Sequence, residues 1–289
     1  MRYLAPTSVG EAITMLTEQG GRVFAGATDV IPQMRAGRDL GEVMVDLKKI
    51  GRLTNVEVRG DTWIIGAATP TSALTSNPDF VADFPGLAHG AGLIGSDQVQ
   101  SRSSLGGNLC NASPGADSVP AMVVNQARAV VAGPGGGRTI SVAEVPTGPG
   151  QTSLGDGEFV VEFEIDRPAA GTSDAYQRVT PRTEMDIAIV GAGSRISLDS
   201  DGVCTSATIA LGAVAPTVVR VPGAEAVLVG AKLVGDDVDQ AALDAAAAAA
   251  SAACNPIDDM RGTIAYRTHV AGVLVERTVI EAARRASER

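Results

Sequence analysis

Residues 104–108 read Ser104-Leu105-Gly106-Gly107-Asn108, and a polar stretch follows after three further residues, Ala112-Ser113-Pro114-Gly115-Ala116-Asp117. The paired glycines predict a loop whose backbone N–H groups are not covered by side chains. Ser104 adds a hydroxyl that can donate a hydrogen bond to a phosphate oxygen. Taken alone, the same pattern is also typical of a tight turn without a ligand.

A second loop with similar chemistry lies near the N-terminus. Residues 22–26 are predicted to form a buried strand, which runs into Ala25-Gly26-Ala27-Thr28-Asp29. Thr28 supplies a hydroxyl here, and Gly26 allows the backbone to approach a ligand closely. The two loops together suggest a site for an anionic group, although each alone fits an ordinary turn.

The composition excludes several classes of partner. A hydrophobic content of 45% is that of a globular protein, and the formal net charge of -10 would repel nucleic acid and an anionic membrane surface. No apolar run approaches the roughly 20 residues of a membrane span, and the N-terminus lacks the apolar core of a signal peptide. We therefore expect a cytoplasmic protein whose partners are proteins or small molecules.

Cysteine and histidine are too sparse for a metal centre of the common kinds. The chain contains Cys110, Cys204, Cys254, His89 and His269, and no Cys-x-x-Cys pair. An iron–sulfur cluster or a structural zinc ion usually needs four such ligands close together. We expect no metal site in this chain. An iron–sulfur cluster that works with this protein would have to be bound by a different polypeptide chain.

Local patterns predict a mixed chain of helices and strands. Ser8 and Glu11 have the spacing of a capping box, which predicts a helix that ends at Gly20. Residues 119–126 fit a helix or a strand. Further strands are expected at residues 42–47, 56–58, 62–67, 127–132, 138–142, 158–165, 186–198 and 202–214, and helices over most of 71–100, at 241–253 and from 264 onward.

Two glycine-rich segments mimic nucleotide-binding motifs without completing them. Residues 189–193 begin like a dinucleotide-binding fingerprint, but Ile196 occupies the third glycine position and a β-type sequence follows. Residues 133–137 lack the Gly-Lys-Ser/Thr ending of a phosphate-binding P-loop. We interpret the first as a strand with small residues and the second as a hairpin turn.

The order of four segments indicates a family. Residues 104–117 resemble the second flavin-binding signature of the FAD-carrying medium subunit of molybdenum hydroxylases, which include carbon monoxide dehydrogenase, xanthine dehydrogenase and nicotinate-type hydroxylases. Residues 23–30 resemble its first signature, and residues 266–277 resemble its closing helix. Arg182-Thr183-Glu184-Met185-Asp186-Ile187-Ala188 resembles its Arg-x-x-x-Asp-Ile-Ala segment. The four segments occur in the family's order over essentially the whole chain.

This resemblance implies an α+β fold with two domains. The first, residues 1–170, would be a vanillyl-alcohol-oxidase (PCMH)-type FAD-binding domain of two α+β lobes with the cofactor between them. The second, residues 176–289, would be a small α+β domain with a three-stranded antiparallel sheet and helices. The linker-like composition of residues 166–171 agrees with a boundary at this point.

The resemblance also implies which residues contact FAD. Both glycine loops would line the pyrophosphate, Ile94 would supply an apolar contact, and Asp117, Arg178 and Val161 would occupy further positions of the cofactor site. No catalytic acid or base is implied, because the flavin performs the redox chemistry. The full set is Val23, Phe24, Ala25, Gly26, Ala27, Thr28, Asp29, Val30, Ile94, Ser104, Leu105, Gly106, Gly107, Asn108, Asp117, Val161 and Arg178.

Two positions leave alternatives open. The family's first loop usually has glycine where this chain has Ala27, so the extra methyl group either crowds a phosphate-binding amide or is tolerated at a negative φ. Cys110 follows the second loop closely enough to lie near FAD, but a small buried side chain is the favoured interpretation.

The resemblance implies an electron-transfer subunit of a larger enzyme. A small subunit would carry two [2Fe–2S] clusters, a large subunit would carry the molybdenum cofactor, and this chain would pass electrons through FAD to a terminal acceptor. The complex would be a dimer of heterotrimers. A stand-alone flavin oxidoreductase and an assembly protein without cofactor are the alternatives. NAD, oxygen, quinone and a carrier protein are all possible acceptors.

Overall fold

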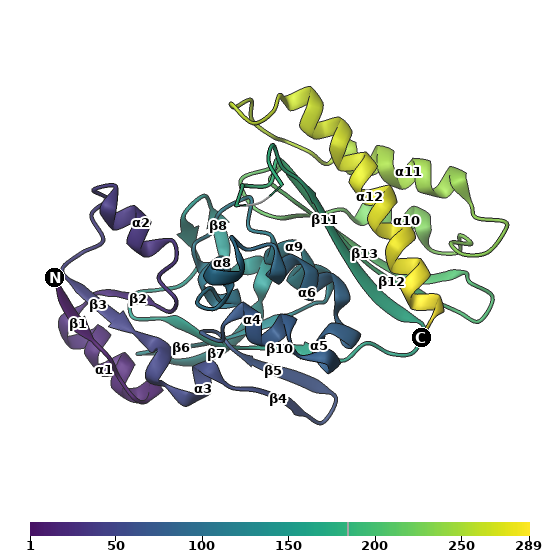
Figure 1. Ribbon diagram of the computed structural model, residues 1–289. Coiled ribbons are helices and arrows are strands. Elements are labelled where there is room, and N and C mark those ends of the chain that lie inside the picture. The colour runs from purple at the N-terminus through teal and green to yellow at the C-terminus, as the bar shows by residue number, and fades with distance from the viewer. Residues whose placement is uncertain (184) are drawn as a thin grey trace.

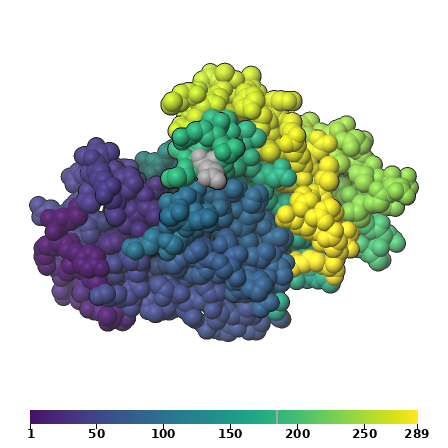
Figure 2. Space-filling model, viewed as in Figure 1, coloured from purple at the N-terminus to yellow at the C-terminus, as the bar shows by residue number. Residues whose placement is uncertain are grey.

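The chain folds into three consecutive units (Figure 1). The computed structural model describes residues 1–289 except Glu184, so this residue of the segment 182–188 lies outside the described residues. The N-terminal lobe is purple, the central lobe is blue to teal, and the C-terminal unit is green to yellow (Figure 1). In Figure 2 the C-terminal unit covers one side of the central lobe, and the N-terminal lobe lies at the opposite end.

The N-terminal lobe is a small parallel sheet in the order β1-β3-β2. Ser8 caps the first helix as predicted, because its Oγ accepts a hydrogen bond from the Glu11 amide (3.1 Å). Glu11 reaches back to the Thr7 amide (2.7 Å). The elements are β1 (Arg2–Leu4), α1 (Val9–Gln19), β2 (Arg22–Phe24), α2 (Val30–Arg35) and β3 (Val43–Asp46).

The central lobe is an antiparallel sheet in the order β4-β5-β10-β6-β7. Its strands are β4 (Val56–Arg59), β5 (Thr62–Gly66), β6 (Arg128–Gly133), β7 (Gly136–Ser141) and β10 (Phe159–Asp166). The strands predicted at residues 56–58 and 62–67 are confirmed and pair as a hairpin, and the glycine-rich segment 133–137 is the β6–β7 hairpin turn. The short pair β8 (Pro146–Gly148) and β9 (Gln151–Thr152) precedes β10.

Short helices cover this sheet and build its core. Leu74, Phe80, Leu87 and Met122 are fully buried against the strands. Residues 119–126, left open by the sequence, are mostly helical. The helices are η1 (Leu47–Lys49), α3 (Gly51–Thr54), α4 (Thr71–Thr75), α5 (Pro78–Asp83), α6 (Pro85–Gly92), α7 (Asp97–Gln100), α8 (Leu105–Cys110), α9 (Ser118–Val124) and η2 (Val142–Glu144).

The prediction of a loop at residues 104–108 is wrong, because this segment begins α8. Ser104 is the N-cap, and its Oγ accepts a hydrogen bond from the Gly107 amide (3.1 Å). Glycine disfavours a helix, but Gly106 is required by packing, since a Cβ there would lie 2.4 Å from the Ala67 carbonyl oxygen. The close approach of α8 to the end of β5 therefore explains the glycine.

The C-terminal unit is an antiparallel sheet covered on one face by three helices (Figure 1). The strands predicted at residues 186–198 and 202–214 correspond to β12 and β13, whereas β11 and the two-residue β14 were not predicted from the residues; the family resemblance implied three strands, and the sheet has four. Gly193 allows β12 to lie close to α9, because a Cβ there would be 3.2 Å from the Pro120 backbone. The elements are β11 (Thr172–Val179), β12 (Val190–Leu198), β13 (Cys204–Gly212), β14 (Val219–Arg220), α10 (Pro222–Leu228), α11 (Gln240–Ala252) and α12 (Ile264–Ser287).

The helix predicted from residue 264 onward is present as α12. Val270 and Leu274 pack in the core of the C-terminal unit, whereas Ile280 on the same helix is 44% exposed. Glu281 pairs with Arg285 one turn later (2.8 Å). In the part of the chain that the structure describes, no helix has both the length and the apolarity to cross a membrane.

Candidate functional site

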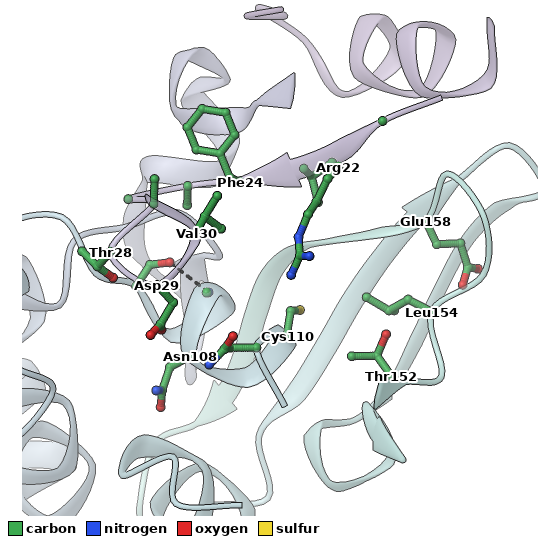
Figure 3. A pocket seen from close by; sticks show the side chains of 18 of the residues that line it. Arg22, Phe24, Thr28, Asp29, Val30, Asn108, Cys110, Thr152, Leu154 and Glu158 are labelled. Carbon is green, nitrogen blue, oxygen red and sulfur yellow. Dashed lines mark hydrogen bonds between the residues drawn. The ribbon is translucent and has the colours of Figure 1, made fainter. Parts of the chain in front are cut away.

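A cleft of 340 Å³ separates the N-terminal lobe from the central lobe. Its walls come from the β2–α2 turn, the first turn of α8 and the segment between β9 and β10, and Ile94 lies at one end. Figure 3 shows side chains from these segments facing a common space. The sequence-predicted residues that line it are Val23, Phe24, Ala25, Gly26, Ala27, Thr28, Asp29, Val30, Ile94, Ser104, Gly107 and Asn108.

The β2–α2 turn presents unused backbone donors to the cleft. Among the described residues, the consecutive amides 26–30 donate to no protein acceptor. All five residues line the cleft, and they precede or begin α2. Consecutive free N–H groups at such a turn form a concave, positively polarised surface, which is the arrangement that binds phosphate oxygens.

Gly26 and Ala27 give this turn an unusual backbone. A Cβ on Gly26 would lie 1.7 Å from the Arg102 carbonyl oxygen, so glycine is required where the turn meets the segment before α8. Ala27 has φ of 60°, so the alternative of a negative φ is wrong. A left-handed conformation costs alanine about 1–2 kcal/mol. The turn is therefore strained at Ala27.

The α8 side of the cleft offers fewer free amides than the sequence suggested. The Gly106 amide donates to the Ala67 carbonyl (3.1 Å), and the Gly107 amide donates to Ser104 Oγ. What α8 presents to the cleft is the bare Cα of Gly107 and the side chains of Asn108 and Cys110. Asn108 is oriented by Ser118, whose Oγ donates to Asn108 Oδ1 (2.7 Å).

Five predicted contacts do not line this cleft. Leu105 and Val161 are buried in the cores, with 1% and 0% exposure. Gly106 faces a neighbouring apolar cavity of 100 Å³. Asp117 and Arg178 lie together at a third place, where Arg178 Nη1 donates to Asp117 Oδ2 (2.5 Å).

The Asp117–Arg178 pair is buried beside a second polar cavity of 450 Å³. This cavity is lined by Arg178 and by residues on both sides of Ile94, so Ile94 lies between it and the cleft. The Tyr176 hydroxyl also donates to Asp117 (2.9 Å). Burial raises the pKa of Asp117 to about 6, even though Arg178 and Tyr176 favour its charged form.

This pKa predicts a pH effect on stability. The folded chain binds more protons than the unfolded chain between the ordinary value of 3.8 and about 6. Lowering the pH from 7 to 5 should therefore stabilise the native chain relative to Asp117→Asn by about 1 kcal/mol. Urea unfolding of both proteins at the two pH values measures this difference. A relative loss of stability at pH 5 would show that the ion pair lowers the pKa instead.

Several cleft residues were not predicted from the sequence. The Arg22 guanidinium extends into the cleft, across from Leu154 (Figure 3). Thr152, Asp156 and Glu158 complete the wall formed between β9 and β10. No recognisable motif marks this segment in the sequence. It lines the cleft because of its position after β9 in the fold.

Cys110 lines both the cleft and the apolar cavity. Burial raises the pKa of its thiol to about 12, so the thiol stays protonated and unreactive near neutral pH. Both interpretations of Cys110 therefore apply: the residue lies at the edge of the cleft, and its side chain packs as a small buried group. Among the described residues, no group of His, Cys, Asp or Glu could hold a metal ion.

Asp29 has a carboxyl group whose pKa is raised, whereas hydrogen bonds from Arg138 and the Gly155 amide lower the pKa of Glu158 on the opposite wall. Burial raises the pKa of the Asp29 carboxyl above its ordinary value. The Asp29 side chain lies at the start of α2 and makes no capping hydrogen bond. A partly buried carboxylate beside free amides disfavours a second negative charge at that point, so an anion would bind along the amides and away from Asp29.

Comparison with known proteins identifies two family regions. Residues 1–168 match the FAD binding domain in molybdopterin dehydrogenase, and residues 175–282 match the CO dehydrogenase flavoprotein C-terminal domain. The carbon monoxide dehydrogenase medium chain of Hydrogenophaga pseudoflava is 34% identical over 96% of this chain and 95% of its own length. The xanthine dehydrogenase FAD-binding subunit of Escherichia coli O157:H7 is 26% identical over 97% and 95%.

Solved structures agree with these matches over the full length. A carbon monoxide dehydrogenase structure from Hydrogenophaga pseudoflava, lacking the Mo-pyranopterin moiety, superposes with a TM-score of 0.92 at 35% identity, covering 99% of this chain and 98% of that chain. Quinoline 2-oxidoreductase from Pseudomonas putida 86 superposes with a TM-score of 0.90 at 27% identity and the same coverage. The expected α+β fold is thus confirmed.

Proposed function

Because the chain belongs to the FAD-binding subunits of the molybdenum hydroxylase family, of the carbon monoxide dehydrogenase and xanthine dehydrogenase type, we propose that FAD binds in the cleft between its first two lobes. The protein is an oxidoreductase subunit, and FAD is its cofactor. The observation that carries the proposed location is the run of free amides at residues 26–30. These amides can donate hydrogen bonds to the oxygens of a pyrophosphate.

Different residues of the cleft would bind different parts of FAD. Residues 26–30 would donate to the pyrophosphate, with the Thr28 hydroxyl as a further donor. Gly107 leaves room on the opposite wall, and Asn108 adds an amide that is already oriented by Ser118. The flavin supplies the redox chemistry when bound, and the chain supplies binding and orientation. Leu105, Gly106 and Val161 would support the cleft from behind.

The second cavity would receive the far end of the cofactor. It adjoins the cleft at Ile94, and it is lined by Arg178, which pairs with Asp117 behind it. A buried ion pair is rigid, and its donors are held in place before a ligand arrives. We propose that Arg178 and Asp117 contribute to FAD through this cavity rather than through the pyrophosphate.

The wider role is electron transfer within a complex. We propose that electrons pass from a small [2Fe–2S] subunit through FAD to a terminal acceptor, while a large subunit holds the molybdenum cofactor, in a cytoplasmic dimer of heterotrimers. Relatives named as a medium chain and as a subunit of a dehydrogenase complex support this assignment. The ends of the two family matches, at residues 168 and 175, support domains at 1–170 and 176–289.

Native mass spectrometry of the protein purified from its own cells tests this assignment. Recovery with two partner subunits, molybdenum and iron supports the complex. Recovery with FAD alone and turnover of a substrate would favour a stand-alone flavin oxidoreductase, and recovery without any cofactor would favour an assembly protein.

Gly107→Val tests the cleft. A Cβ at Gly107 would meet only Ser104 Oγ, at 3.3 Å, so the chain has room to fold, but the branched side chain would occupy the cleft. We expect bound FAD, measured by absorbance of the purified chain, to fall at least tenfold, with the circular dichroism spectrum unchanged.

A matched control for this variant is Gly10→Val, because Gly10 lies on α1 with nothing within 4 Å of its Cβ position. It should retain FAD. If Gly107→Val also retains FAD at the native level, the pyrophosphate does not lie beside α8.

A further inference from the structure

The carbonyl group that precedes the free amides has a dedicated hydrogen-bond donor. Lys48, on η1 behind the β2–α2 turn, donates from Nζ to the Ala25 carbonyl oxygen (2.7 Å). The same Nζ lies 4.7 Å from the centre of the Phe24 ring. Its side chain is 28% exposed, so the ammonium group is partly withdrawn from water. Lys48 does not line the cleft and was not predicted as a site residue.

Lys48 is in turn held by Asp46. Lys48 Nζ donates to Asp46 Oδ1 (2.7 Å), and the Lys48 amide donates to the same oxygen (3.0 Å). The Tyr3 hydroxyl donates to Asp46 Oδ2 (2.6 Å). Burial alone would raise the pKa of Asp46, but the hydrogen bonds from Lys48 and Tyr3 outweigh it and lower the pKa. The carboxylate is therefore charged and satisfied at both oxygens near neutral pH.

The geometry of a peptide plane connects Lys48 to the cleft. In a trans peptide the carbonyl of one residue and the N–H of the next point in opposite directions, and none of the described peptide bonds is cis. Binding the Ala25 carbonyl to Lys48 therefore directs the Gly26 N–H away from η1. Gly26 is the first of the free amides at the cleft.

The strain at Ala27 explains why such an anchor is useful. Ala27 adopts φ of 60°, which alanine leaves readily when the neighbouring backbone is free to rotate. A turn that spends only part of its time in the binding conformation binds its ligand more weakly by that fraction. An anchor one residue before the glycine and two before Ala27 reduces the number of alternative conformations.

We propose that Lys48 is a positioning residue that holds the β2–α2 turn in its strained, FAD-binding conformation, with Asp46 and Tyr3 orienting its ammonium group. This inference rests on the proposed function, in which residues 26–30 bind the FAD pyrophosphate. Lys48 acts through the Ala25 carbonyl and does not touch the cofactor.

A double-mutant cycle in the full-length chain tests the proposal. Lys48→Met keeps the aliphatic stem and removes the donor, so we expect the Kd for FAD, measured by fluorescence titration of the deflavinated protein, to rise about tenfold. That change corresponds to about 1.4 kcal/mol. In the Ala27→Gly background the conformation is no longer strained, and Lys48→Met should raise the Kd less than threefold.

Lys49→Met is the matched control, because it removes the same charge from the neighbouring, exposed position. It should change the Kd less than twofold, and the circular dichroism spectrum of the FAD-free Lys48→Met protein should stay that of the native chain, even though loss of the Asp46 ion pair lowers its thermal midpoint. An equal effect of Lys48→Met in both backgrounds, or an equal effect of Lys49→Met, would overturn the proposal. If Gly107→Val loses FAD and Lys48→Met does not, only the role of Lys48 fails; if both retain FAD, the cleft assignment fails.

Discussion

Replacing Gly26 with alanine is expected to reduce the affinity for FAD by at least a hundredfold. The added Cβ would lie 1.7 Å from the carbonyl oxygen of Arg102 and 2.4 Å from its carbonyl carbon. Backbone atoms cannot rotate aside as a flexible side chain can, so the β2–α2 turn and the segment before α8 must separate. Both walls of the cleft move as a result, and overpacking of this kind costs about 1–3 kcal/mol of stability.

The measurement is FAD titration by fluorescence, together with urea unfolding of the FAD-free chain. Gly51→Ala is the control, because nothing lies within 4 Å of the Cβ position of Gly51 on α3. This variant should bind FAD as the native chain does. Native affinity in Gly26→Ala would mean that the two walls need not stay in contact to bind FAD.

Asp174→Ala is expected to lower the free energy of unfolding by roughly 3 kcal/mol or more. Asp174 lies on β11, and its buried carboxylate accepts hydrogen bonds from three groups of the central lobe. These are the amides of Gly86 (2.8 Å) and Leu87 (2.9 Å), at the start of α6, and the Asn125 side chain (2.6 Å). Alanine would leave both helix amides buried without an acceptor, and the Asn125 side chain would keep only its hydrogen bond to the Ala121 carbonyl. Burial raises the pKa of this carboxyl, and the helix amides partly offset that effect.

Urea unfolding of the full-length chain measures this loss. Asp174→Asn retains one acceptor oxygen, so its free energy of unfolding should lie between those of the native chain and the alanine variant. Asp244→Ala, on the exposed side of α11, should stay within about 0.5 kcal/mol of the native chain. A loss below about 1 kcal/mol in Asp174→Ala would show that α6 and β11 are held together by apolar packing alone.

The same side chain explains how the C-terminal unit is attached. Only a short turn separates β10, which ends at Asp166, from β11, which begins at Thr172. Arg289, at the end of the chain, donates to the Asp83 carbonyl on α5 of the central lobe (3.2 Å) and to the Thr172 carbonyl on β11 (3.0 Å). The two family regions are therefore joined by polar contacts that no linker composition could indicate.

The sequence predicted well where a structure depends on neighbouring residues. The Ser8 cap, the hairpin at residues 56–67 and the long C-terminal helix were all recognised, because capping, alternation and helical periodicity are satisfied within a few residues. The order of the family segments likewise identified the fold and the cofactor. Residues 104–108 were misassigned because paired glycines predict a loop unless the packing of Gly106 against Ala67 is known.

Long-range packing determined the rest of the candidate site. Sequence rules favour a negative φ at Ala27, whereas the folded turn, which packs against Arg102 and accepts a hydrogen bond from Lys48, has a φ of 60° there. Asp117 and Arg178 pair across 61 positions of the chain, and so lie beside the second cavity rather than the cleft. Local propensities allow each residue several conformations. Which conformation is stable depends on contacts such as a buried carbonyl, a cleft wall or an ion pair, and these form only when distant segments come together.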